Sequence, residues 1–101
     1  METNNYTLSQ EQRDRAKKSL HDGIYWLLLY KEKEDPCLME YFDSLMTKIN
    51  VMNGLLGYPA HMIDLFTLLE IARSELEKGD AFNFKLYRKA VLDAESVVDK
   101  L

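Results

Sequence analysis

Apolar residues recur along this chain mostly at intervals of three or four residues, which is the spacing of one face of an α-helix and not of a β-strand. The first stripe comprises Ala16, Leu20, Ile24, Leu27 and Leu28. The second comprises Leu38, Phe42, Leu45, Ile49, Met52 and Leu56. The third comprises Tyr58, Met62, Leu65, Leu69, Ala72 and Leu76, and the fourth Phe84, Tyr87, Val91, Ala94, Val98 and Leu101. These stripes predict four amphipathic helices.

Capping residues and glycines lie between the stripes and predict where each helix begins and ends. Ser9 with Gln12 matches a capping box at the first start. The other signals are Asp35 and Pro36 before the second helix, Gly57 after it, Gly79 after the third and Asn83 before the fourth. We therefore expect helices over approximately 9–33, 36–56, 59–78 and 84–100, and a frayed segment over 1–7.

Four helices joined by short turns most simply form an all-α, antiparallel, up-down-up-down four-helix bundle. With 101 residues the chain can bury a substantial core, so we expect residues 1–101 to form a single helical domain. A dimer is the alternative packing, in which the first helix pairs with its copy across a twofold axis.

Composition excludes several classes of function. The formal net charge of −4 argues against a dedicated nucleic-acid binder, because basic groups supply most of the affinity for phosphates. The longest apolar run, 24–30, is far shorter than the ~20 residues that span a bilayer, so no membrane partner is expected. Cys37 is the only cysteine and cannot form an intramolecular disulfide, which agrees with the cytoplasmic localisation that we expect.

The run 24–30 contains seven consecutive apolar residues, more than one helix face can direct into a core. On a helical wheel, Trp26 and Leu29 fall on the outer side, with Arg15 upstream of them. Because Trp and Tyr concentrate binding energy at interfaces, this side is a candidate contact surface. Its expected partner-binding residues are Tyr25, Trp26, Leu29, Tyr30 and Lys33. The alternative is that a loop, the segment Tyr6–Leu8 or the wide core of a small bundle covers them.

This surface favours a small non-enzymatic interaction module, regulatory or inhibitory, that binds another protein or a second copy of itself. Immunity proteins and regulators encoded on mobile elements are often of this kind. Nothing in the sequence chooses among these partners.

His21 is the residue that carries the alternative functions. The stretch Arg13–Gly23, in which basic residues precede Leu-His-Asp-Gly, resembles the phosphoacceptor segment of one histidine-kinase dimerisation family. The resemblance implies that His21 accepts a phosphoryl group while Asp22 orients the ring. The sequence departs from that family at Tyr25 and Trp26, where glycine and glutamine are usual, and it contains no ATP-binding domain.

Arg15 and His21, six residues apart, also match the spacing found in a class of all-helical ribonucleases. There the arginine would hold a phosphate and the histidine would move a proton. The structural interpretation of His21 is a histidine at the border of the core, hydrogen-bonded to a neighbouring helix.

Metal and cofactor chemistry is not expected. A di-metal carboxylate bundle needs Glu-x-x-His pairs, and neither His21 nor His61 follows a glutamate by three residues. Cys37 has no histidine near it in sequence that would make it a nucleophile. We therefore predict no catalytic residues, no metal site and no cofactor.

Overall fold

The computed structural model describes residues 8–101, and the segment 1–7 predicted to fray lies outside the described residues. The described helices are α1 (Gln10–Glu32), α2 (Leu38–Leu55), α3 (Met62–Leu76) and α4 (Phe84–Val98), with a short 3-10 helix, η2 (Gly79–Ala81), before α4. Residues 8–101 contain no strand. The predicted all-helical class is confirmed, and the arrangement is compatible with a helical bundle.

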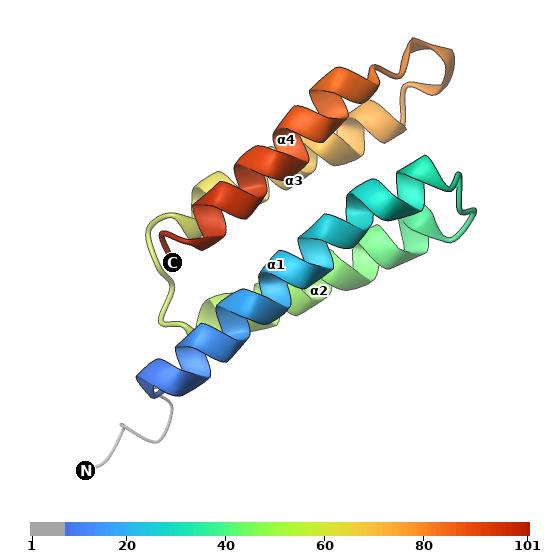
Figure 1. The fold of residues 1–101 in the computed structure, drawn as a ribbon. Coiled ribbons are helices and arrows are strands. Elements are labelled where there is room, and N and C mark those ends of the chain that lie inside the picture. Colours follow the sequence, from blue (N-terminus) through green and yellow to red (C-terminus); the bar gives the residue numbers. More distant parts are fainter. Residues whose placement is uncertain (1–7) are drawn as a thin grey trace.

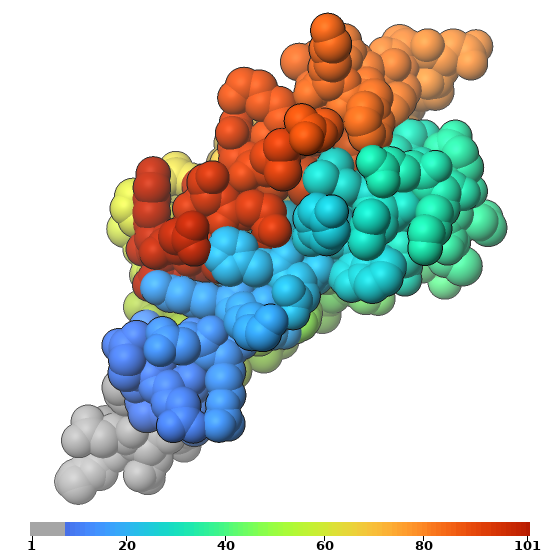
Figure 2. Space-filling model, viewed as in Figure 1, coloured from blue at the N-terminus to red at the C-terminus, as the bar shows by residue number. Residues whose placement is uncertain are grey.

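The helices lie as two neighbouring pairs, α1 beside α2 and α3 beside α4 (Figure 1). α4 also packs against α1, which joins the two pairs. In the space-filling view, α1 (blue to cyan) and α4 (orange to red) together form the face turned toward the reader (Figure 2). α1 therefore has neighbours on two sides, α2 and α4.

The core is built from the predicted stripes. All five predicted positions of α1 are buried, and Leu20, Ile24 and Leu27 have no exposed surface. Two stripe residues are exceptions, because Tyr58 is 76% exposed and Phe84 is 38% exposed. Both lie at the ends of their stripes, Tyr58 after the end of α2 and Phe84 at the first residue of α4, where fewer neighbours cover them.

The two proline-based helix starts were predicted too early. α2 begins at Leu38, because Asp35 Oδ1 accepts the Cys37 N–H at 2.8 Å and closes a separate turn before the helix. α3 likewise begins at Met62, whose N–H donates to the Pro59 carbonyl at 3.0 Å. Each proline thus starts a tight turn and not the helix itself.

The predicted caps at three other helix ends are confirmed. Ser9 Oγ accepts the Gln12 N–H at 3.2 Å and Gln12 Oε1 accepts the Ser9 N–H at 2.8 Å, the reciprocal pair of a capping box. Asn83 Oδ1 accepts from the first turn of α4. Gly57, with φ of 79°, ends α2 in the left-handed region.

α1 ends in the same left-handed way without a glycine. Glu34 has φ of 51°, and its N–H donates to Lys31 O while the Asp35 N–H donates to Tyr30 O, both at 3.0 Å. This is a Schellman motif in which a glutamate occupies the position that glycine prefers. The Glu34 carboxylate is exposed, so its 3.1 Å ion pair with Lys31 adds little stability.

We therefore expect Glu34→Gly to raise the free energy of unfolding by about 0.4–1 kcal/mol, since the left-handed strain is relieved. Urea unfolding followed by circular dichroism measures the change. The control is Glu70→Gly at an exposed position inside α3, which should lower stability by about 1 kcal/mol. A loss of stability in both variants would contradict the assignment of strain to Glu34.

Candidate functional site

The outer side of α1 exposes aromatic residues in its second half. Tyr25 is 49% and Trp26 is 43% exposed, so neither the core nor another described helix encloses them. Leu29 and Tyr30 are half-buried and Lys33 is exposed. We call these five residues, Tyr25, Trp26, Leu29, Tyr30 and Lys33, the α1 outer face. The structure places Tyr25, Trp26, Leu29 and Tyr30 in the second half of α1 and Lys33 at its C-cap.

Three aromatic rings, those of Trp26, Tyr30 and Tyr41, pack in a row at the α1 outer face. Trp26 meets Tyr30 edge-on with ring centroids 5.9 Å apart, and Tyr30 lies 4.6 Å from Tyr41 of α2. The ammonium of Lys33 lies 5.9 Å from the centroid of the Trp26 ring, within cation–π range. The indole is thus held from two sides while much of its surface faces solvent.

Tyr41 supports this row of rings from α2, and the sequence analysis did not identify Tyr41 as part of the site. The Tyr41 hydroxyl donates to the Gly23 carbonyl at 2.6 Å. Burial raises the pKa of Tyr41, and the neighbouring Tyr30 adds a smaller rise. A Cβ at Gly23 would lie 3.0 Å from Leu45 Cδ1, so the glycine lets α2 approach α1 closely. A glycine in the middle of a predicted helix was the signal available for this contact.

Arg15 does not join the α1 outer face. Its guanidinium pairs with Glu11 one turn earlier, and both side chains are largely exposed. Trp26 lies three turns further along α1. Arg15 therefore does not extend the aromatic surface around Trp26.

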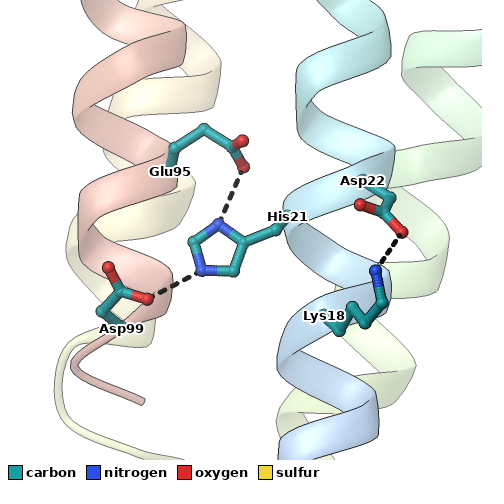
Figure 3. Close-up of polar contacts among 5 residues, drawn as sticks. All are labelled: Lys18, His21, Asp22, Glu95 and Asp99. Atoms are coloured by element: carbon teal, nitrogen blue, oxygen red, sulfur yellow. Dashed lines mark hydrogen bonds and ion pairs between the residues drawn. The ribbon is translucent and has the colours of Figure 1, made fainter.

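His21 lies on the other edge of α1 and contacts α4 (Figure 3). Its Nδ1 is 3.3 Å from Glu95 Oε1, and its Nε2 is 2.8 Å from Asp99 Oδ1. Ionised carboxylates only accept hydrogen bonds, so this geometry fits an imidazolium that donates from both nitrogens. His21 thus forms a bridge between α1 and α4, as the structural interpretation of this histidine predicted.

Burial raises the pKa of the Glu95 carboxyl, and the charge and hydrogen bond of His21 oppose that rise. The Glu95 side chain is 20% exposed, so its ionised form is poorly solvated without a cationic neighbour. His21 is that neighbour, and the bridge holds the Glu95 carboxylate in a partly buried site.

Arg15, His21 and Asp22, the residues of the alternative phosphoacceptor and nuclease sites, do not come together in the structure. Asp22 points away from the ring of His21 and lies 3.6 Å from Lys18 (Figure 3). Arg15 contacts Glu11. Neither the orienting role given to Asp22 nor the phosphate-holding role given to Arg15 has its geometry here.

A second exposed apolar region was missed by the sequence analysis. Ile63 and Ile71 of α3 are 73% and 49% exposed, and Leu86 of α4 is 50% exposed. A groove of about 310 Å³ between α3 and α4 is lined in part by Leu68, Ile71 and Leu86. The available signal was that isoleucines lie off the predicted stripe of α3, so that this helix is apolar on more than one side.

Glu75 is a buried charge that the sequence did not single out. Its carboxylate accepts from the Asn83 N–H at 2.7 Å and from Lys78 Nζ at 2.8 Å. The hydrogen bond from Lys78 and the one from Asn83 lower its pKa against the effect of burial. These contacts fix the turn that leads into α4, so Glu75 has a structural role.

The described residues offer no metal site: within 8–101 no three His, Cys, Asp or Glu side chains are grouped as metal ligands would be. Cys37 is exposed at the turn before α2. Over the same part of the chain, no helix has both the length and the apolar content needed to cross a membrane.

Comparisons with protein-family models, with curated proteins and with solved structures found no match to this chain.

Proposed function

We propose that this protein acts without catalysis, by binding another protein or a second copy of itself through the α1 outer face. The observation that carries the proposal is the indole of Trp26, 43% exposed yet held between Tyr30 and Lys33. The proposal includes an antiparallel up-down-up-down order of the helices and a cytoplasmic location. Regulators and inhibitors are the classes that fit it.

The aromatic side chains of the α1 outer face are preorganised for binding. A contact residue that is already fixed loses little conformational freedom on binding, so more of its burial contributes to affinity. Tyr41 positions Tyr30 through the hydroxyl contact with Gly23, and Tyr30 in turn positions Trp26. Rigid aromatic side chains of this kind dominate the binding energy of many interfaces.

We do not extend the proposal to phosphoryl transfer or RNA cleavage by His21. A phosphoryl group on either ring nitrogen would displace Glu95 or Asp99 and would lie near the negative charge of the carboxylate that remains. A catalytic proton transfer would likewise require the ring to leave one of these contacts.

The test is substitution on the α1 outer face. We expect Trp26→Ala and Leu29→Asp each to weaken assembly by at least about tenfold, because one removes the anchor and the other places a charge in the contact. Sedimentation velocity over a concentration series measures self-association, and affinity capture from the native host measures partner binding. Circular dichroism confirms that each variant is folded.

The matched control is Ile63→Asp, which places the same charge on an exposed apolar position of α3. We expect it to leave assembly through α1 unchanged. A wild-type protein that stays monomeric, together with no captured protein that is lost in the α1 variants, would contradict the proposal.

A further inference from the structure

Three residues of α1 and its C-cap residue Lys33 form a narrow stripe along the outer side of the helix. Asp22, Trp26, Leu29 and Lys33 are separated by four, three and four residues, the repeat of a coiled-coil seam. Asp22 and Lys33 are exposed, Trp26 is 43% exposed and Leu29 is half-buried. The stripe therefore has apolar residues at its centre and opposite charges at its two ends.

An antiparallel pairing of two copies of this stripe is self-complementary. In an antiparallel pair, the residue numbers at opposing positions always add up to the same total. The pairs Trp26–Leu29 and Asp22–Lys33 have the same total. When Trp26 lies opposite Leu29 of the second copy, Asp22 therefore lies opposite Lys33 of the second copy. The twofold axis repeats both contacts, so the pairing buries Trp26 and Leu29 of each copy and neutralises a charge at each end. Antiparallel coiled-coil packing requires this same alternation of seam positions.

Other pairings of the stripe are disfavoured by charge. A parallel pairing puts Asp22 opposite Asp22 and Lys33 opposite Lys33, and like charges face each other at both ends. An antiparallel pairing shifted by seven residues puts Trp26 opposite Asp22 and Lys33 opposite Arg15. Only one of these registers pairs apolar residues with apolar residues and acid with base.

We propose that the α1 outer face binds a second copy of this chain, with α1 antiparallel to its copy and Trp26 packed on Leu29 of the second copy. This inference rests on the proposed function and specifies the partner. The interface is closed by its twofold axis, so it yields dimers and not filaments. A contact of about three helical turns is at the low end of interface size, and we expect a dissociation constant in roughly the micromolar range.

Charge reversal tests the register. Asp22→Lys and Lys33→Asp should each raise the dissociation constant of the dimer by about tenfold, since each creates two like-charge contacts by symmetry. The double variant Asp22→Lys/Lys33→Asp should recover an affinity within about threefold of wild type. The control Glu70→Lys, an exposed position on α3, changes net charge as Asp22→Lys does and should leave dimerisation unchanged. Sedimentation equilibrium from micromolar to millimolar protein gives the constants.

Disulfide trapping tests the direction of pairing. In a Cys37→Ser background, a mixture of Asp22→Cys and Lys33→Cys chains should form a mixed disulfide under mild oxidation, and each chain alone should form little. Equal cross-linking of Asp22→Cys alone would show a parallel pair and overturn the inference. A monomer at millimolar concentration, with capture of another protein that depends on Trp26, would overturn this pairing and leave the proposed function standing.

Discussion

Replacing Tyr87 by alanine is expected to lower the free energy of unfolding by about 3–5 kcal/mol, the range typical of deleting a fully buried aromatic ring. Tyr87 of α4 has no exposed surface, and its hydroxyl donates to the Leu27 carbonyl of α1 at 2.8 Å. Its ring lies 5.6 Å from that of Phe82, in the segment between α3 and α4. One side chain therefore joins α4 to α1 and to the preceding turn.

Tyr87→Phe separates the ring from the hydroxyl. It should lower the free energy of unfolding by only about 1 kcal/mol, because the ring still fills the core while one hydrogen bond is lost. Urea unfolding of the two variants and of wild type gives both differences. Equal losses for the phenylalanine and alanine variants would contradict the assignment, since the ring would then contribute nothing beyond the hydroxyl.

The same pair of variants has a signature at high pH. Burial raises the pKa of Tyr87 well above its ordinary value. The stabilisation from its neutral hydroxyl is complete below the unfolded pKa of about 10 and is lost as the pH rises from there toward the folded pKa. Stability of wild type should therefore fall more steeply above about pH 10 than that of Tyr87→Phe.

The helical class could be predicted because the stripes report burial directly. Leu20, Ile24 and Leu27 recur at helical spacing, and all three have no exposed surface. Tyr58 and Phe84 follow the same spacing and are nevertheless exposed, because periodicity gives the direction of a side chain but not whether another helix reaches that end. The turns after Asp35 and Pro59 were missed for a local reason, since proline suits the first position of a tight turn as well as that of a helix.

The candidate site also has a part that could be predicted from the sequence and a part that could not. A helical wheel was enough to place Trp26 outside the core, since the residues that set its direction all lie within α1 itself. The support from Tyr41 could not be predicted, because it depends on how closely α2 approaches Gly23. Glu95 and Asp99 lie 74 and 78 residues from His21, and no local pattern brings such positions together.

The two edges of α1 therefore have different roles. The edge that carries His21 is paired with α4, whereas the outer side that carries Trp26 has no described helix over it. Binding at the outer side need not disturb the contact with α4, since His21 and Trp26 point in different directions from the helix axis. Substitutions at His21 should therefore change stability and leave assembly through the α1 outer face intact.

His21→Ala is expected to lower the free energy of unfolding by about 1.5–3 kcal/mol, because it removes hydrogen bonds between an imidazole and two carboxyl groups. The variant leaves Glu95, whose side chain is 20% exposed, without its cationic neighbour, and the pKa of Glu95 should rise further once that opposing charge is removed. Urea unfolding measures the first effect, and a nuclear magnetic resonance titration of the Glu95 carboxyl measures the second.

The matched control is His61→Ala, because His61 also lies within hydrogen-bond distance of a carboxylate, Asp64, but within one exposed turn. We expect this variant to lose no more than about 0.5 kcal/mol. The penalty of His21→Ala should shrink as the pH falls through the raised pKa of Glu95, since protonation of that carboxylate removes its charge from the bridge in wild type as well. A penalty for His21→Ala no larger than that for His61→Ala would show that the contact between α1 and α4 does not depend on this bridge.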